Sequence, residues 1–344
     1  MILKLQLQNF RNFTKKQLEF GQGINIIIAP NAKGKTNILE SLFFLSSGKS
    51  FKARLSEESI KYESDLARIK GDNLEVVLTR GFLDIGKVTP EKVAKKKLLV
   101  NGISKRLIDF AGNFKATLFL PEDLDLVTST PTLRRKFLDT VLSQVDREYR
   151  RAIGSYEKGI RQRNRLLFRI REEGLSRSHL LFWNQLLIKN GNYITEKREE
   201  LIEFINSHKS NISNKYSISY DKSVISEGRL EQYKNEEVAS ATTLVGPHRD
   251  DFIFLEDNRE LSSFGSRGEQ RMAVLWLKLG ELAFIEEKTD EKPTLLLDDI
   301  FSELDHEHRK VVLDSISNHQ VIITSADEHD IEGIKDSGTI IINL

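Results

Sequence analysis

Residues 24–41 read INIIIAPNAKGKTNILES, an apolar β-branched run followed by a loop and then by a helical pattern. This order is the layout of a P-loop, in which successive backbone N–H groups and a helix N-terminus hold phosphates. Gly34, Lys35 and Thr36 fill the last positions of the pattern G-x-x-x-x-G-K-[ST], whereas Ala29 stands at its first glycine. An alanine is tolerated there if its φ angle is negative. The stretch predicts a nucleotide-binding site, and a strand–helix turn that happens to carry a lysine is the alternative.

The P-loop pattern assigns a role to several side chains. Lys35 is expected to reach the β- and γ-phosphates of ATP, and the Thr36 hydroxyl is expected to bind Mg²⁺. Gly34 lets the backbone approach an anion without a Cβ in the way. The residues predicted to hold the nucleotide are Pro30, Asn31, Ala32, Lys33, Gly34, Lys35, Thr36 and Asn37.

Composition limits the class of protein. The 344 residues allow two domains, or one large domain with an insertion. Cysteine is absent, which excludes disulfides, thiol zinc sites and a thiol nucleophile. The net charge is +1, so a nucleic-acid surface must be a local patch. No signal peptide or membrane-spanning run is visible, which predicts a cytoplasmic protein without a membrane partner.

The pattern along the chain changes twice. The first part is β-rich, with hairpin signals at Gly71-Asp72-Asn73 and Asn101-Gly102. Helical spacing then covers residues 132–173 and 178–207, which predicts an antiparallel helical arm. The last part predicts strands at 294–297, 321–324 and 339–342, with a helix at 307–316. We therefore predict an α/β fold in which residues 1–127 and 238–344 form a head with an antiparallel β lobe, and residues 128–237 form an inserted arm.

The strand Leu295-Leu296-Leu297 ends in two carboxylates, Asp298 and Asp299. Asp298 is expected to hold Mg²⁺, usually through water, and Asp299 stands where a general base for the attacking water belongs. An aspartate pair that caps the following helix is the alternative. Lys35, Asp298 and Asp299 are thus the predicted catalytic residues, and Thr36 and Asp298 the predicted metal ligands.

A second motif lies upstream of these carboxylates. Ser266-Arg267-Gly268-Glu269-Gln270 precedes a helical run, and Ser302-Glu303-Leu304-Asp305 follows the aspartates. This order resembles the signature, Walker B and D-loop of ABC-type ATPases. A helix N-terminus attracts phosphate, and in such ATPases it faces the nucleotide of the other subunit. The resemblance implies an ATP-dependent homodimer with two-fold symmetry, and adds Ser266, Gly268 and Gln270 to the predicted nucleotide contacts.

Further motifs resemble the bacterial RecF family over nearly the whole chain. They are Asn9-Phe10-Arg11-Asn12-Phe13, Asn37-Ile38-Leu39-Glu40, Pro121 to Val127, Arg134 to Asp139, Gly246 to Asp251, and Ser266 to Leu279. The resemblance implies an SMC-like ABC ATPase that binds ATP and DNA in replication-linked recombinational repair. It implies RecR and RecO as partners, and Arg11 as a further nucleotide contact.

The chain also departs from the usual ABC pattern. Arg267 occupies a signature position where uncharged residues are familiar, and Asp299 replaces the usual glutamate. A Q-loop glutamine is missing near residues 119–123, and Thr324 or Ser325 stands where the switch histidine is expected. We therefore predict a weak, DNA-stimulated ATPase with slow hydrolysis. The alternative is a DNA-binding scaffold that uses ATP only as structural glue; a transporter motor or a nuclease fits the sequence less well.

Arginine is concentrated in the first helical stretch. The predicted DNA-binding residues are Arg147, Arg150, Arg151, Arg161 and Arg165. A phosphate-tracking surface is one interpretation, and an ordinary solvated helix face is the other. The sequence leaves open whether single-stranded, gapped or duplex DNA is preferred. His306 and His308 fit a solvent-facing helix start better than a metal site.

Overall fold

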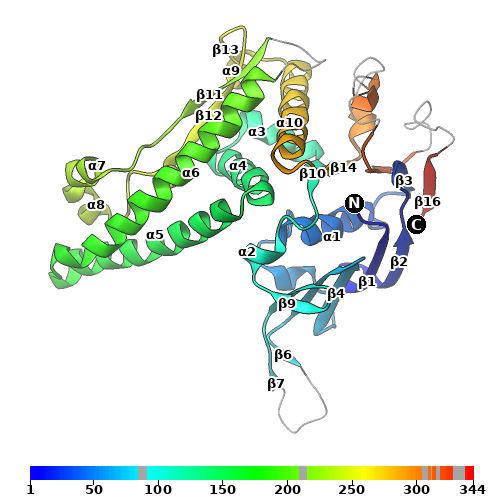
Figure 1. Cartoon of the computed structure of the whole chain (residues 1–344), viewed down its shortest axis with the longest axis horizontal. Coiled ribbons are helices and arrows are strands. Elements are labelled where there is room, and N and C mark those ends of the chain that lie inside the picture. Colours follow the sequence, from blue (N-terminus) through cyan, green and yellow to red (C-terminus); the bar gives the residue numbers. More distant parts are fainter. Residues whose placement is uncertain (84–90, 209–214, 304–308, 311, 315–317, 328–337) are drawn as a thin grey trace. The chain divides into compact units, whose positions relative to one another are not determined.

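The structure, a computed structural model, describes residues 1–83, 91–208, 215–303, 309–310, 312–314, 318–327 and 338–344 (Figure 1). It divides into two compact units: residues 1–123 with 281–344, here the head unit, and residues 124–280, here the arm unit. The predicted α/β fold with an ABC-type head, an antiparallel lobe and a helical insertion is confirmed. His306, His308 and half of the helix predicted at 307–316 lie outside the described residues.

The head unit contains an antiparallel and a parallel sheet. Among the described residues their strand orders are β2-β1-β4-β5-β8-β9 and β10-β14-β15-β3-β16. The antiparallel strands are β1 (Lys4–Phe10), β2 (Phe13–Glu19), β4 (Leu66–Gly71), β5 (Leu74–Thr79), β8 (Lys96–Val100) and β9 (Ile103–Lys105). The parallel strands are β3 (Ile24–Ile28), β10 (Ala116–Phe119), β14 (Thr294–Asp298), β15 (Val321–Ser325) and β16 (Ile340–Asn343). Strands β6 (Phe82–Leu83) and β7 (Glu91–Lys92) pair in a short antiparallel ribbon.

Helix α1 (Lys35–Ser47) lies between the two sheets. Its apolar residues Ile38, Leu42 and Phe44 are fully buried in a core that takes Ile69 from the antiparallel sheet and Leu296 from the parallel one. Burial of this kind contributes about 25 cal/mol per Å² of apolar surface. The helix that follows the P-loop is therefore fixed on both sides. Short helices complete the unit: η1 (Ser56–Ser59), α2 (Leu107–Phe110) and η5 (Ile300–Glu303).

Both predicted hairpins of the antiparallel sheet are confirmed. β4 pairs with β5 across Asp72 and Asn73, and β8 pairs with β9 across Asn101 and Gly102. Asn101 has a φ of 51° and Gly102 a φ of 75°, as a type I′ turn requires.

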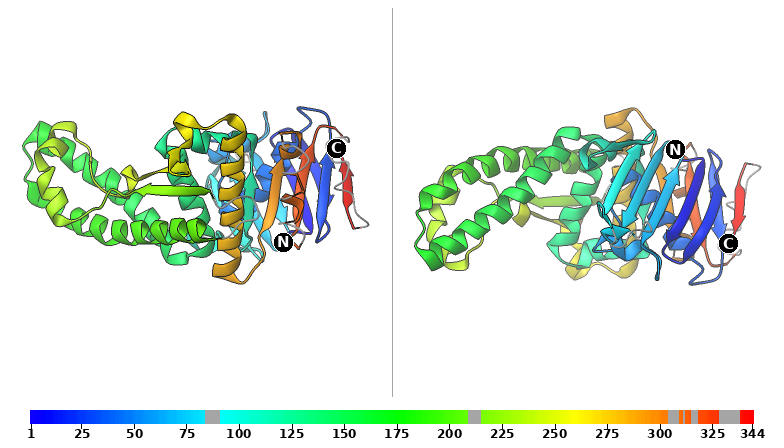
Figure 2. Two further views of the ribbon diagram at one scale, coloured as in Figure 1. Left: turned by 90° about the horizontal axis from the view of Figure 1, so that it is seen from above. Right: turned by 90° about the horizontal axis from the view of Figure 1, so that it is seen from below.

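The arm unit is mainly helical. Its helices are η2 (Pro121–Leu124, shared with the head unit), α3 (Asp125–Thr128), α4 (Pro131–Val145), α5 (Arg147–Glu173), η3 (Arg177–Leu180), α6 (Leu181–Ser207), α7 (Glu227–Gln232), α8 (Lys234–Ser240), η4 (Pro247–Arg249), α9 (Leu261–Phe264) and the start of α10 (Arg267–Thr289). The predicted antiparallel pair is formed by α5 and α6, which run side by side (Figures 1 and 2). Within the described residues, no helix is both long and apolar enough to span a bilayer.

The single helix predicted over residues 132–173 is wrong in one respect. Asp146 adopts an extended conformation, with φ −122° and ψ 112°, and separates α4 from α5. Its side chain accepts hydrogen bonds from the backbone N–H groups of Glu148 and Tyr149. An aspartate in this position caps a helix N-terminus, and this local bond competes with continuation of the helix.

The second expected domain boundary also differs from the structure, because residues 238–280 belong to the arm unit. Strand β12 (Asp251–Glu256) pairs with β11 (Tyr216–Asp221) and β13 (Arg259–Glu260) in an antiparallel sheet. Asp251 at the start of β12 also forms a bidentate ion pair with Arg134 of α4, with bonds of 2.6 and 2.9 Å. These contacts join the segment to the helices.

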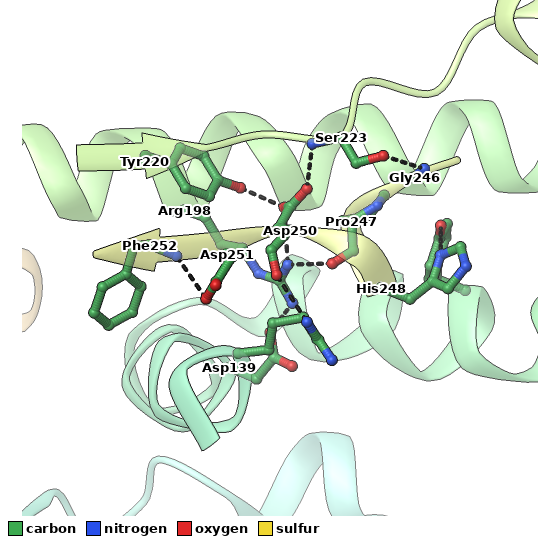
Figure 3. Close-up of polar contacts among 12 residues, drawn as sticks. Asp139, Arg198, Tyr220, Ser223, Gly246, Pro247, His248, Asp250, Asp251 and Phe252 are labelled. Atoms are coloured by element: carbon green, nitrogen blue, oxygen red, sulfur yellow. Dashed lines mark hydrogen bonds and ion pairs between the residues drawn. The ribbon is translucent and has the colours of Figure 1, made fainter. Parts of the chain in front are cut away.

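A buried polar network fixes the same strand at its N-terminal end (Figure 3). Arg198 of α6 is 1% exposed and binds Asp250 at 3.0 Å, Asp139 at 2.8 Å and the Pro247 carbonyl at 2.7 Å. Asp250 is fully buried and also accepts from the Tyr220 hydroxyl and the Ser223 amide. The motif from Gly246 to Asp251 therefore links strands to helices within the arm unit.

His248 belongs to this motif and is neutral at pH 7. Burial lowers its pKa to about 4. Its Nε2 lies 3.0 Å from the Thr243 carbonyl, which only accepts, so Nε2 carries the proton. Nδ1 then accepts from the hydroxyl of Tyr156 at 2.9 Å. The ring of His248 thus connects η4 to α5 through its hydrogen bond with Tyr156.

We expect Asp250→Ala to lower the free energy of unfolding of the arm unit by about 3–5 kcal/mol, because it leaves Arg198 buried with half of its counter-charge. Glu173→Ala removes an exposed ion pair with Arg169 and is the matched control, with an expected loss under about 1 kcal/mol. Chemical denaturation followed by circular dichroism measures both. Equal losses would contradict a stabilising role for the network.

Candidate nucleotide-binding site

The loop between β3 and α1 has the conformation that a P-loop needs. Ala29 does not have a positive φ, which meets the condition for replacing the first glycine, whereas Gly34 has a φ of 104°. A Cβ on Gly34 would lie 2.7 Å from side-chain atoms of Asn12 and Phe13. Only glycine fits there, since other residues would be strained and would clash.

The Lys35 side chain is turned into its own loop. It is 7% exposed, and its Nζ donates to the Ala29 carbonyl at 2.6 Å and to the Asn31 side chain at 3.3 Å. Both acceptors are neutral oxygens. A phosphate oxygen carries negative charge and forms a stronger bond with an ammonium group.

A cavity of about 400 Å³ lies over this loop. Of the predicted residues, the cavity is lined by Asn31, Ala32, Gly34, Lys35, Thr36, Asn37, Asp298 and Asp299. Pro30 and Lys33 belong to the loop but do not line the cavity, and the Lys33 carbonyl accepts a hydrogen bond from Asn12 at 3.0 Å. The structure thus brings together chain segments more than 250 residues apart in the sequence.

The register of the parallel sheet determines where the two aspartates lie. β14 pairs with β10 and β15, and Asp298 at its end lies beside Thr324. The hydroxyl of Thr324 donates to Asp298 at 2.7 Å. Asp299 has a φ of +53°, and its amide donates to the carbonyl and to the hydroxyl of Thr324, each at 3.2 Å.

The residues around the cavity fit Mg²⁺ bound together with a nucleotide. Mg²⁺ keeps several waters and takes one or two protein ligands with phosphate oxygens, rather than an all-protein cage. Thr36 and Asp298 line one cavity and supply a hydroxyl and a carboxylate. Within the described residues no cluster of three or more acidic or histidine side chains could hold a metal ion alone.

Arg11 supports the P-loop from outside the cavity, which differs from the expected nucleotide contact. It adopts a φ of +53° and forms a bidentate ion pair with Glu40 of α1, with bonds of 2.8 and 2.7 Å. Its third nitrogen donates to the Glu58 carbonyl at 3.1 Å. The Glu40 side chain is fully buried. The guanidinium is thus committed to neutralising a buried carboxylate.

Sequence reasoning missed three cavity-lining residues: Lys52, Pro121 and Glu122. The loop that carries Lys52 is held by Ser50, whose Oγ accepts from the amides of Lys52 and Ala53 and donates to Glu40. Glu122 lies in the segment where a Q-loop glutamine was missing. Lys52 lies in no motif singled out from the sequence, whereas Pro121 and Glu122 lie in a family motif at the expected place of the Q-loop, where the missing glutamine left their role unrecognised.

The signature segment begins helix α10 in the arm unit. Ser266 and Glu269 form a capping box: the Ser266 amide donates to the Glu269 carboxylate at 2.7 Å, and the Glu269 amide donates to the Ser266 hydroxyl at 3.3 Å. These bonds also lower the pKa of Glu269. Ser266, Arg267 and Gly268 are exposed, and a Cβ on Gly268 would meet nothing closer than 4.0 Å.

Gln270 differs from its predicted role as a nucleotide contact. It is 7% exposed, and its amide nitrogen donates to the carbonyls of Leu261 at 2.9 Å and Gly265 at 3.2 Å. Gln270 therefore holds the chain that enters α10. The exposed part of the signature is the first turn, from Ser266 to Gly268.

The predicted DNA-binding arginines of α5 fall into two groups. Arg150 donates to the Ser143 carbonyl at 2.7 Å, and Arg151 pairs with Glu148. Arg147, Arg161 and Arg165 are exposed, as is Arg151. Within the part of the chain that the structure describes, Arg161 and Arg165 form no ion pair.

Comparison with known proteins places this geometry among related chains. Residues 1–341 match the family model described as RecF/RecN/SMC N terminal domain. The chain is 34% identical to the DNA replication and repair protein RecF of Herpetosiphon aurantiacus, over 96% of this chain and 94% of the relative. It is 37% identical to that of Lachnoclostridium phytofermentans, over 94% and 92%.

A solved structure of the recombination mediator protein RecF with ATPrS, in the RecFOR pathway, superposes with a TM-score of 0.86. That protein is 32% identical, and the alignment covers 100% of this chain and 96% of the other. A second solved structure, of RecF with ATP, gives a TM-score of 0.83 at 33% identity, over 96% and 92% of the two chains.

Proposed function

Because this chain belongs to the RecF family within the RecF/RecN/SMC group, we propose that it is an ATP-dependent DNA-binding protein of replication-linked recombinational repair. ATP pairs two copies on DNA, and slow hydrolysis separates them. One observation carries the proposal: a single cavity is lined by the P-loop lysine and by the carboxylates that end β14.

Each residue of the cavity has a distinct task in hydrolysis. Backbone N–H groups from Ala32 to Lys35 surround the phosphates, and Lys35 moves from the Ala29 carbonyl to the β- and γ-phosphates. Thr36 and Asp298 would hold Mg²⁺, which would neutralise charge on the phosphate oxygens. Asp299 accepts a proton from the attacking water. The water oxygen bonds to the γ-phosphorus, and the bond between that phosphorus and the ADP oxygen breaks.

Two copies are needed to enclose the nucleotide. The exposed first turn of α10, from Ser266 to Gly268, offers N–H groups and the positive end of the helix dipole to a phosphate. In a two-fold dimer each copy receives this turn from its partner. The capping box satisfies the N–H groups of Ser266 and Glu269, so Arg267 and Gly268 supply the N–H groups that this turn offers to a γ-phosphate.

DNA is expected to follow the outer face of α5. Exposed cations recur along this helix at intervals of three, four and seven residues, which places them on one face: Arg147, Arg151, Lys158, Arg161, Arg165 and Arg169. The helix has 27 residues and is about 40 Å long, a length equal to about 12 base pairs of duplex. Such a row of cations can contact the phosphate backbone of DNA, but it does not distinguish one base sequence from another.

We expect the double variant Arg161→Ala/Arg165→Ala to bind DNA more weakly and to lower the slope of log K against log salt by about 2, because each lost phosphate contact removes about 0.9. Lys189→Ala/Lys234→Ala removes two exposed cations elsewhere in the arm unit and is the control. Fluorescence anisotropy over a salt series measures the slope. An unchanged slope would show that this face does not bind DNA.

The function as a whole is tested by light scattering after size exclusion, with ADP or ATP and with or without DNA, together with ATP turnover. ATP-dependent dimers whose turnover rises with DNA are the expected result. Dimers without turnover would favour a scaffold in which ATP serves only as structural glue. RecR and RecO are the proposed protein partners, on the basis of family membership, and pull-down with purified proteins tests them.

A further inference from the structure

The hydroxyl of Thr324 is a buried polar group that the steps above do not use. Thr324 lies on β15, is 1% exposed, and stands beside Asp298 of β14 and Ile27 of β3 in the parallel sheet. Its position is therefore fixed by both the strand that carries the carboxylates and the strand that enters the P-loop.

The hydrogen bonds of this hydroxyl have a defined direction. It has one proton, and the possible acceptors are Asp298 Oδ1 at 2.7 Å and the Leu297 carbonyl at 3.4 Å. Distance and negative charge both select the carboxylate. The oxygen lone pairs remain available to the Asp299 amide, whose nitrogen lies 3.2 Å away. One hydroxyl thus joins the side chain of one aspartate to the backbone of the next.

The second bond matters because of the backbone at Asp299. Its φ of +53° lies in the left-handed region, which L-residues other than asparagine and aspartate seldom adopt. The amide is held by two acceptors of the same residue, the Thr324 hydroxyl and carbonyl. The left-handed backbone and these two hydrogen bonds set the direction in which the Asp299 side chain extends beside the cavity.

We propose that Thr324 is a positioning residue for ATP hydrolysis. Its hydroxyl sets the orientation of the Asp298 carboxylate toward Mg²⁺ and holds Asp299 in the backbone conformation from which it reaches the attacking water. Thr324 itself touches neither nucleotide nor metal. The inference rests on the function proposed above, and it assigns to Thr324 a role that acts through the two aspartates.

A pair of variants separates the hydroxyl from the shape of the side chain. Thr324→Val keeps the branched shape, suits a β-strand and removes the hydroxyl. Thr324→Ser keeps the hydroxyl and removes a methyl group. We expect Thr324→Val to bind ATP within about twofold of the native protein and to lower kcat about 10- to 100-fold. We expect the Mg²⁺ concentration for half-maximal turnover to rise, and Thr324→Ser to restore most of both.

Two readouts do not depend on turnover. Hydrogen exchange at the Asp299 amide in the nucleotide-free protein is expected to quicken in Thr324→Val and to stay near the native rate in Thr324→Ser. The rise in Tm that Mg²⁺ adds in the presence of ADP is expected to shrink in Thr324→Val alone. Thr324→Cys, whose thiol is a weak hydrogen-bonding group, replaces Thr324→Val if the latter folds poorly.

The outcomes distinguish this inference from the proposed function. Native turnover by Thr324→Val, equal impairment of Thr324→Ser, or a loss of ATP binding in Thr324→Val would each overturn the positioning role. Absence of turnover in the native protein with DNA would instead count against the proposed ATPase. In that case, the exchange rate at Asp299 and the Mg²⁺ effect with ADP still decide whether Thr324 positions the aspartates.

Discussion

Lys35→Ala is expected to weaken ATP binding by about 100-fold or more and to abolish ATP-driven dimerisation. Lys35 lines the cavity, and its present partners are two neutral oxygens, so a charged phosphate is a better acceptor. Hydrogen bonds to charged groups contribute about 1.5–3 kcal/mol each, and Lys35 is assigned two phosphates. Isothermal titration calorimetry with ATP and light scattering measure the two effects.

The matched control for this variant is Lys70→Ala. Lys70 is an exposed lysine on β4 of the same unit and does not line the cavity. It is expected to bind ATP and to dimerise as the native protein does. A Lys35→Ala protein that still dimerises with ATP would remove Lys35 from the phosphates and would undermine the proposed site.

Asp299→Asn is expected to bind ATP normally and to hydrolyse it about 10²- to 10⁴-fold more slowly, the usual contribution of a general base. Asparagine tolerates the left-handed backbone as well as aspartate does, so the substitution preserves the φ of +53° and removes only the base. Steady-state phosphate release and nucleotide binding are the measurements. ATP-dependent dimers of this variant should persist, because their release depends on hydrolysis.

Asp290→Asn provides an unusually close control. Asp290 has the same φ of 53°, is exposed and lies outside the cavity, so it undergoes the same chemical change in the same backbone conformation. Its turnover is expected to match that of the native protein. If Asp299→Asn also turned over at the native rate, the proton acceptor would have to be another group at the cavity, such as Glu122.

Local patterns in the sequence predicted the parts of the fold that local chemistry determines. The P-loop, the strand that ends in Asp298 and the two hairpins each depend on residues within a few positions of one another. Their roles follow from backbone geometry, such as the positive φ of Gly34 and Gly102. The order of these motifs also sufficed to indicate an ABC-type head and the RecF family.

Most failures depend on contacts that a motif does not reveal, several of them between distant segments, whereas the break at Asp146 comes from a local helix cap. Arg11 is committed to Glu40, and Gln270 to the carbonyls that precede its helix, which a motif does not reveal. Lys52 and Glu122 enter the cavity only after the sheets pack on α1. The membership of residues 238–280 in the arm unit depends on buried ion pairs such as that between Arg198 and Asp250.

The strand order of the parallel sheet has a consequence for folding during synthesis. β3, which leads into the P-loop, has β15 and β16 as its neighbours, and these strands end at Ser325 and Asn343. A nascent chain therefore carries its Ile24–Ile28 segment unpaired on both edges until the residues of β15 and β16 have been synthesised. Such an apolar segment is a hazard for aggregation, and closure over nearly 300 residues is slow. The strand that leads into the P-loop therefore takes its place in the sheet only after β15 and β16 have been made.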